Sequence, residues 1–147
     1  MSLLDAINIG SAGLFAHGRR LEVHAKNMAN IDTPNYVRKI PVLMSKDDVG
    51  FPELLNRMKD ETFKTGALPS SPGGVDMLGV VEDPTPGDLV YSPTHPQADK
   101  NGYIRRSNVN PLVDMADATM SSRAYEASLA VITLTKNMAQ RATEIGK

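Results

Sequence analysis

Two histidines near the N-terminus are the first residues of this chain that could support chemistry. His17 and His24 are seven residues apart, so a helix would place them on one face, with Glu22 nearby. A zinc ion needs three or four ligands in a closed geometry, and this segment offers no third histidine. We therefore predict no metal site and expect both histidines at the surface or in an interface.

Acidic and hydroxyl side chains in the middle of the chain offer a second kind of chemistry. Their spacing suggests neither an apolar pocket nor a partner base, no G-x-S-x-G motif surrounds the serines, and no phosphate-binding loop is present. We predict that the protein is not an enzyme and binds no cofactor. The alternative, an enzyme that uses the acids, would lose its function if two of them became asparagine. The residues concerned are Asp47, Asp48, Asp60, Glu61, Ser70 and Ser71.

Composition narrows the classes of function. The chain has 147 residues, with sixteen Lys and Arg against seventeen Asp and Glu, which argues against a general nucleic-acid or anionic-membrane binder. Basic doublets such as Arg38-Lys39 are scattered, and we interpret them as solvated surface. The absence of cysteine excludes disulfide scaffolds and thiolate sites. We expect neither a membrane-spanning helix, which needs ~20 apolar residues, nor a secretory signal peptide.

The distribution of proline divides the chain. All ten prolines lie between Pro34 and Pro111, and both ends are proline-free and helical in pattern. We predict a mainly α fold with a small β-rich insertion, in which long N- and C-terminal helices form a coiled-coil-like pair. The predicted parts are an N-terminal helix with a following motif (1–35), a central turn-rich β region (36–110) and a C-terminal helix (111–147).

The first helix is predicted over Ser2–Asn30. Ser2 and Asp5 have the spacing of a capping box at its start. Three glycines within it each cost about 1 kcal/mol relative to alanine, which indicates either close backbone packing or a helix that its neighbours must order. Apolar or small residues repeat at alternate spacings of three and four, through Leu4, Ile7, Ser11, Leu14, Gly18, Leu21, Ala25 and Met28.

A second, longer helix is predicted over Asn110–Lys147. Asn110 can cap it and Pro111 suits its first position. A seam of mostly apolar residues runs through Val113, Asp117, Met120, Ala124, Ala127, Val131, Leu134, Met138, Arg141 and Ile145. A further apolar stripe runs through Leu112, Met115, Tyr125, Leu129 and Ile132. One neighbouring helix cannot bury both stripes, so the pattern indicates that other subunits cover the rest.

Short strands are predicted between the helices. Val37–Met44 contains a proline and would be an edge strand at best, whereas Val75–Glu82 has the best strand pattern. Leu89–Tyr91 and Tyr103–Arg105 are predicted to pair as a hairpin with a long loop. The other predicted elements of this region are a short helix, Glu53–Lys59, and a loop, Leu68–Gly74.

The end of the first helix carries a recognisable motif. Residues 21–36 read L-E-V-H-A-K-N-M-A-N-I-D-T-P-N-Y. They resemble the pattern L-x-V-x-A-x-N-x-A-N-x-x-T-P-x-Y found near the N-terminus of flagellar basal-body rod and hook proteins. The alternative, from physical chemistry alone, is a helix stop at Asn30 followed by a turn, because Thr33 before Pro34 should be extended.

The middle of the chain resembles one branch of that family more closely. Val90–Asp99 has the pattern V-Y-x-P-x-H-P-x-A-D, which is similar to the proximal rod subunits. The resemblance continues into the C-terminal helix, where Asp114 and Ser128 stand in place of the family's usual Glu and Asn. Ser45–Pro72 matches no pattern of the family.

The resemblance implies a structural subunit of the proximal rod of the bacterial flagellar basal body, which assembles through its terminal helices into a tube. The implied partners are other rod proteins, the connection to the membrane-embedded ring and the flagellar type III export apparatus, with no nucleic acid and no membrane span. Such export needs no cleaved signal peptide, and the mature location would be the periplasm-spanning rod. The alternatives are another axial protein of this family and, from a different class, a soluble helical adaptor for a single partner.

The resemblance and the helical stripes together select the residues predicted to contact neighbouring subunits. Arg123 and Glu126 are three residues apart. The alternative to a subunit contact is an ion pair within the helix, which would contribute little to the stability of the fold. The predicted contact residues are Leu4, Ile7, Leu14, Leu21, Asn27, Met28, Asn30, Thr33, Pro34, Tyr36, Met120, Arg123, Tyr125, Glu126, Val131, Leu134 and Met138.

Overall fold

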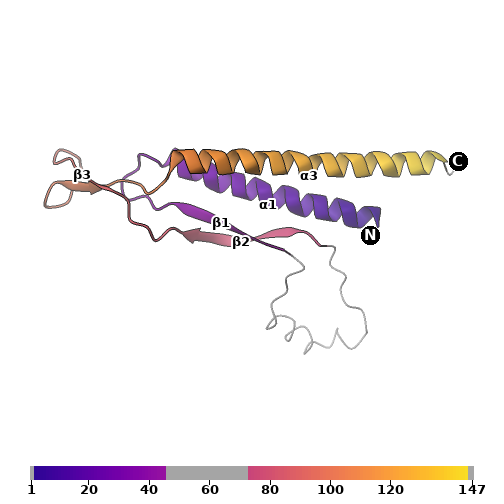
Figure 1. The fold of residues 1–147 in the computed structure, drawn as a ribbon, viewed down its shortest axis with the longest axis horizontal. Coiled ribbons are helices and arrows are strands. Elements are labelled where there is room, and N and C mark those ends of the chain that lie inside the picture. The colour runs from indigo at the N-terminus through magenta and orange to yellow at the C-terminus, as the bar shows by residue number, and fades with distance from the viewer. Residues whose placement is uncertain (1, 46–72, 146–147) are drawn as a thin grey trace, which may run out of the picture.

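Two long helices lie side by side along most of the molecule (Figure 1). The structure is a computed structural model and describes residues 2–45 and 73–145. Helix α1 spans Leu3–Ala29 and helix α3 spans Pro111–Ile145. They run in opposite directions, so the N- and C-termini lie at the same end of the molecule (Figure 1). The predicted mainly α fold with two long terminal helices and a small β region is confirmed.

Both helices begin at the caps that the sequence predicts. The Ser2 hydroxyl accepts the Asp5 backbone N–H at 3.1 Å, and the Asp5 carboxylate accepts the Ser2 N–H at 2.6 Å, which completes a capping box. At the start of α3, the side-chain oxygen of Asn110 accepts the backbone N–H groups of Leu112 and Val113 at 3.1 and 3.3 Å. Donors that a helix would otherwise leave unpaired are thereby satisfied.

In the described residues, four strands form two separate antiparallel hairpins. Strand β1 (Lys39–Ser45) pairs with β2 (Val75–Glu82), and this hairpin packs against α1. Strand β3 (Leu89–Tyr91) pairs with β4 (Tyr103–Arg105) beyond the far end of the helices (Figure 1). The proline of β1 is tolerated because each sheet has only two strands, so every strand has a free edge. The predicted strands and the predicted hairpin are confirmed.

Several predictions fall outside the described residues. They are the short helix Glu53–Lys59, most of the loop Leu68–Gly74, and the acids and serines at Asp47, Asp48, Asp60, Glu61, Ser70 and Ser71.

Glycines bring α1 unusually close to α3. A Cβ atom added at Gly10 would lie 2.8 Å from Cγ1 of Ile132, and one added at Gly13 would lie 2.9 Å from the Ser128 hydroxyl oxygen. Both distances are below ordinary van der Waals contact, so the helix backbones are closer than side chains would allow. Of the two explanations for these glycines, close packing is therefore the one that the structure supports.

The face of α3 that packs on α1 is made largely of small and polar side chains. Ser121 is completely buried and Thr135 nearly so. Their hydroxyls donate to backbone carbonyls one turn earlier, Ser121 to Asp117 at 2.7 Å and Thr135 to Val131 at 2.8 Å. Burial therefore costs these hydroxyls little, because each keeps a hydrogen bond inside its own helix.

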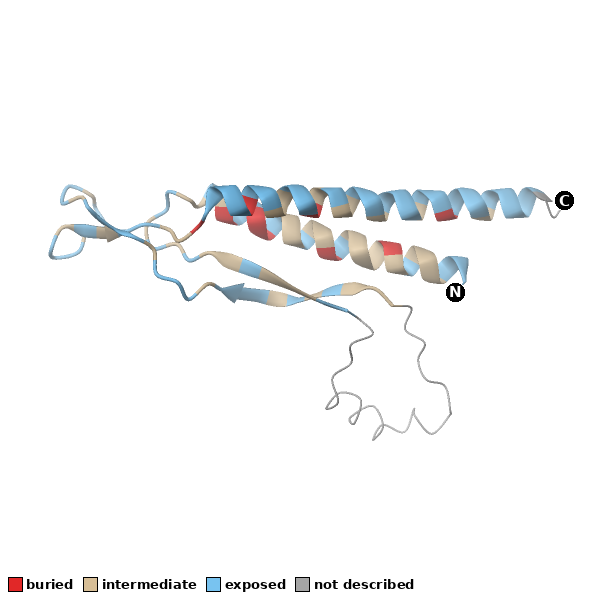
Figure 2. Ribbon diagram, in the orientation of Figure 1, coloured by how far each residue is buried: buried red, intermediate tan, exposed pale blue. Residues whose placement is uncertain are grey.

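The predicted seam of α3 does not face α1. Its large apolar members are about half exposed, and α3 is coloured as exposed along most of its length (Figure 2). From the second predicted stripe, Tyr125 lies against Gly18 and Ile132 against Gly10 of α1. The contact between the two helices is thus offset from the seam that the apolar repeat predicts. The exposed large apolar residues of the seam are Val113, Met120, Val131, Leu134 and Met138.

We expect Gly10→Val to lower the free energy of unfolding by about 1–3 kcal/mol, because the added methyl groups would overpack the contact with Ile132. Gly79→Val is the control, since a Cβ added there meets nothing within 4 Å and valine favours a strand. Urea denaturation of both variants measures the difference. Equal stability of the two variants would contradict the close approach at Gly10.

Candidate assembly interface

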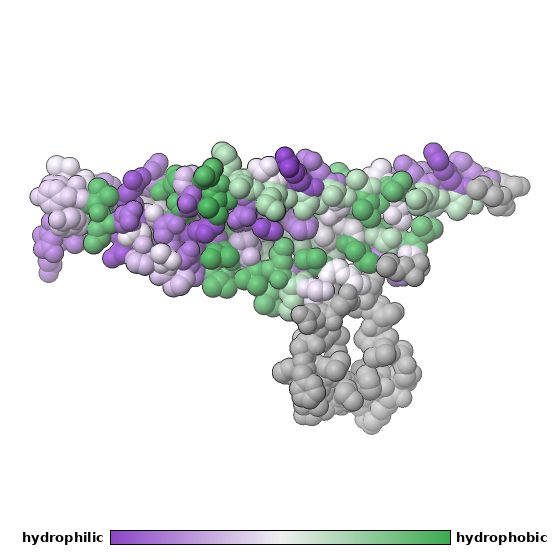
Figure 3. Space-filling view, in the orientation of Figure 1, coloured by the Kyte–Doolittle hydropathy of each residue, from purple (hydrophilic) through white to green (hydrophobic). Residues whose placement is uncertain are grey.

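Apolar side chains lie mostly on the outside of this molecule. In residues 2–45 and 73–145, the only buried hydrophobic residues are Ala16, Val23 and Val109. Hydrophobic surface covers the β1–β2 hairpin and recurs along α3 (Figure 3). Clusters of exposed large apolar side chains mark sites where other molecules bind.

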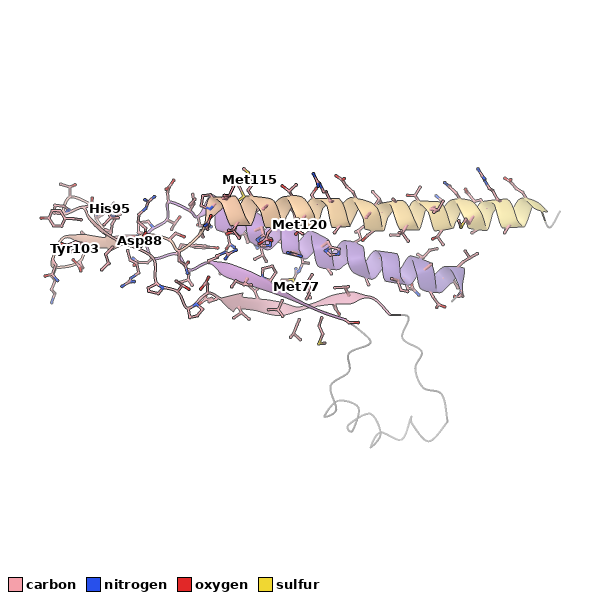
Figure 4. All side chains as sticks on the ribbon, in the orientation of Figure 1. Met77, Asp88, His95, Tyr103, Met115 and Met120 are labelled. Atoms are coloured by element: carbon pink, nitrogen blue, oxygen red, sulfur yellow. The ribbon has the colours of Figure 1, made fainter. Side chains whose placement is uncertain are left out.

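On α3, the exposed apolar side chains lie away from α1. Leu134 is 56% exposed and Met120 62%. Met115 projects from the side of α3 opposite α1 (Figure 4). The exposed large apolar residues of α3 are Leu112, Val113, Met115, Met120, Leu129, Val131, Leu134 and Met138.

An open groove runs along the outer surface of α3. Leu129 and Leu134 contribute its apolar walls, and the small side chains of Ala130 and Thr133 lie between them. Glu126 and Asn137 complete the lining at its two ends. The groove has the stepped arrangement of residues into which a side chain of a second helix can insert.

On α1, the exposed apolar residues are fewer. Leu4 is 70% exposed and Phe15 72%. The other predicted contact residues of α1 are partly covered within the chain, because this helix is packed by α3 on one side and by the β1–β2 hairpin on another. These partly covered residues are Ile7, Leu14, Leu21 and Met28.

A buried polar cluster joins the start of α3 to the end of α1. The Asp114 side chain is completely buried. One of its carboxylate oxygens lies 2.8 Å from Nδ1 of His24 and accepts an N–H of Asn27 at 3.0 Å. Its other oxygen accepts Nε–H of Arg38 at 2.9 Å. The carboxylate is therefore paired on both oxygens, as a buried charge requires.

Asn27 ties the same cluster to strand β1. Its side-chain oxygen accepts the Lys39 backbone N–H at 2.9 Å and the Tyr36 hydroxyl at 3.1 Å. Its side-chain nitrogen donates to the Lys39 carbonyl at 2.7 Å as well as to Asp114. Asn27 is completely buried and bonded within the chain, so in this subunit it positions β1 on α1 rather than facing outward.

The motif residues after Asn27 shape the elbow at the end of α1. The Asn30 side chain donates to the Lys26 carbonyl at 2.8 Å and accepts the Thr33 hydroxyl at 3.2 Å. Pro34 is partly buried, and Asn35 adopts a positive φ of 62°, which asparagine tolerates better than most residues. The geometry thus agrees with the helix stop and turn expected from physical chemistry, and subunit contact by these residues stays a prediction.

Three residues of the cluster were not predicted to act together. His24 is buried rather than exposed, and Arg38 is held against Asp114 rather than lying in a solvated doublet. Asp114 was interpreted as an acid that the helix dipole favours near the start of the helix and as a family departure, without a partner in the fold. Because His24 and Asp114 are 90 residues apart in the chain, no local spacing reveals their contact.

The remaining predicted contacts and sites lie as follows. Arg123 and Glu126 are exposed, and among the described residues no ion pair joins them. Within residues 2–45 and 73–145, no three His, Asp or Glu side chains are placed to hold a metal ion. In the same ranges no helix is long and apolar enough to cross a membrane.

Burial alone would raise the pKa of Asp114, but hydrogen bonds from His24 and Asn27 and the Arg38 charge more than offset it, so the pKa lies below its ordinary value. A depressed folded-state pKa means that the carboxylate stabilises the fold above about pH 4 and that this stability is lost as the pH falls through the folded-state pKa. We expect Asp114→Asn to lose less of its stability than the parent chain between about pH 6 and about pH 3. Parallel urea titrations test this, and identical losses would contradict the cluster.

Comparison with known proteins places this geometry in context. Residues 100–145 match the family model described as "Flagellar basal body rod FlgEFG protein C-terminal". The chain is 34% identical to a protein of Bacillus subtilis (strain 168) over 157 residues and 32% identical to one of Salmonella typhimurium (strain LT2) over 148 residues. Each alignment covers 100% of both chains, and each relative bears the name "Flagellar basal-body rod protein FlgC".

Proposed function

The chain belongs to the FlgC family of flagellar basal-body rod proteins and is a structural subunit of that rod, and we propose that it builds the proximal rod through the outer faces of α1 and α3. One observation carries the proposal: apart from Tyr125 and Ile132, α3 leaves its large apolar side chains outside the contact with α1. In a rod, neighbouring subunits cover these side chains. The sequence predicts coiled-coil-like packing between the two helices of one chain, and the proposal places such packing between subunits instead.

The proposal divides the chain into three parts. The N-terminal part (1–35) and the C-terminal helix (111–147) form the inner layer of a tubular assembly. The central part (36–110) projects outward and contacts neighbouring subunits. Head-to-tail association of this kind produces open helical assemblies rather than closed dimers.

The proposed partners follow from the family. They are other rod proteins, the connection to the membrane-embedded ring, and the flagellar type III export apparatus, which delivers the subunit without a cleaved signal peptide. The subunit acts by assembly and carries out no catalysis, which fits relatives whose names describe rod proteins. Its location is the basal body, where the rod crosses the periplasm.

Deletion of the gene followed by electron microscopy of isolated basal bodies tests the function. We expect rings without a rod or filament. The intact gene should restore the rod, and a gene truncated before Asn110 should not, because α3 carries more of the exposed large apolar side chains than α1 does. Complete, rotating flagella in the deletion strain would contradict a required rod subunit and would favour the adaptor alternative.

A further inference from the structure

A single aromatic side chain stands out on the outer surface of α1. Phe15 is 72% exposed, although burying a phenylalanine side chain is worth about 1.5–3 kcal/mol. Arg19 follows one helical turn later and is also exposed, so the two side chains lie on one face. Glu22 is exposed one further turn along. This outer face therefore offers an apolar knob followed by a positive and then a negative charge.

The outer groove of α3 has the complementary order. Ala130 leaves room between Leu129 and Leu134. Glu126 lies at the end of the groove nearer the start of the helix. Arg123 is exposed one turn before Glu126. In the direction toward the start of α3, the outer face therefore presents an apolar hole at Ala130, then a negative charge at Glu126 and then a positive charge at Arg123.

We propose that Phe15 of one copy of this chain inserts into the α3 groove of a second copy, with Arg19 paired to Glu126. This contact rests on the proposed rod function and specifies one lateral contact between subunits. It uses α1 of one copy and α3 of the other, so it is heterologous. Each copy keeps a free knob on one side and a free groove on the other, and copies can add without limit.

The spacing of the residues supports an antiparallel crossing of the two helices. Phe15 and Arg19 are four residues apart, as are Ala130 and Glu126, which spans about 6 Å in each helix. When the helices run in opposite directions, Phe15 over Ala130 places Arg19 opposite Glu126. The same register places Glu22 of one copy opposite Arg123 of the other. Two charge pairs and the apolar contact therefore agree on one alignment.

The register also requires only a small shift between copies. Within one chain, Gly10 meets Ile132 and Gly18 meets Tyr125, so Phe15 lies near the level of Ala127 and Ser128 in its own α3. Moving the neighbour by about two to three residues, or about 4 Å, along the helix axis brings its Phe15 to Ala130. Both copies then point the same way, as a tube requires.

Reversal of the two charges tests the contact in cells that carry only the variant gene. Arg19→Glu and Glu126→Arg should each reduce the number of basal bodies with complete rods at least about tenfold, since each places like charges together. The double variant should restore rods, because the pair is re-formed with the charges exchanged. Normal rods in both single variants, or no recovery in the double variant, would overturn the contact.

A cross-link locates the contact without disturbing it. The chain has no cysteine. Asn8→Cys in one tagged copy and Asn137→Cys in another therefore give each copy of this chain a single thiol. The proposed register places these residues opposite each other, and mild oxidation should link the two tags. Asn8→Cys paired with Thr119→Cys is the control and should not link.

The outcomes separate this contact from the rod function itself. Rods that assemble normally without the Asn8–Asn137 link would overturn the proposed contact and leave the rod function standing. Linkage of Asn137→Cys to a different rod protein instead of the second tag would also overturn it, because the occupant would not be a copy of this chain. Complete rods in the deletion strain would instead contradict the proposed rod function.

Discussion

Replacing Leu134 by aspartate is expected to abolish rod assembly while leaving export of the subunit intact. Leu134 is 56% exposed in the subunit and forms one wall of the outer α3 groove. The subunit can therefore accept the charge, since water still reaches it. In the assembled rod the same carboxylate would be buried in an apolar contact, at a cost of several kcal/mol at every repeat.

Counting rods in isolated basal bodies, together with measuring the exported subunit, distinguishes these steps. We expect a decrease in complete rods of at least about a hundredfold, with the exported amount unchanged. Leu134→Met is the matched control, because it keeps an apolar side chain of similar size, and it should build rods. Normal rods in the aspartate variant would show that neighbours do not cover this face.

Asp114→Ala is expected to give the largest loss of subunit stability, about 3–5 kcal/mol. The substitution removes the common partner of His24, Asn27 and Arg38. The buried His24 ring would lose its partner, and Asn27 would lose one of its four hydrogen bonds. The partly buried Arg38 would keep only the more distant carboxylates of Asp83 and Asp117. Urea denaturation of the purified subunit measures the change.

Asp117→Ala is the control for the Asp114 variant. Its carboxylate is 30% exposed and lies 3.5 Å from Arg20 and 3.8 Å from Arg38. Solvent screens such pairs, so the loss should stay below about 1 kcal/mol. If the two variants were equally stable, the buried cluster would contribute no more than a surface ion pair.

Local features of the fold could be predicted because their causes are local. The capping box at Ser2 and the Asn110 cap each involve residues within three positions of one another. Strand β2 coincides with the predicted range Val75–Glu82, and the β3–β4 hairpin has the predicted strands. Alternating β-branched and apolar residues between turn signals suffice for such predictions.

The face that α3 presents to α1 could not be predicted from apolar periodicity. The apolar repeat of α3 does not distinguish residues that contact α1 within the subunit from residues that a neighbouring subunit would cover. Gly10 and Gly13 allow a close approach that suits the small Ser128 and Ser121 side of α3, and most of the large apolar residues are left outside. As an interface signal the sequence pattern stays a prediction, and it carries no indication of which partner covers which stripe.

The polar cluster could not be predicted for a different reason. Asp114 near the start of a helix has a sufficient local explanation in the helix dipole. Only the elbow after α1, which returns Arg38 to the start of α3, brings His24 and Asp114 together. Likewise, the motif residue Asn27 had a family explanation as a contact before its four hydrogen bonds within the chain were visible.

Oxidation of the outward-facing methionines tests most directly whether neighbouring subunits cover α3. Met115, Met120 and Met138 are 56%, 62% and 53% exposed in the subunit, and their thioethers oxidise according to solvent access. We predict that hydroxyl-radical labelling, read by mass spectrometry, oxidises Met120 and Met138 at least about tenfold more slowly in isolated basal bodies than in the free subunit. Equal rates in the two samples would contradict assembly through the outer face of α3.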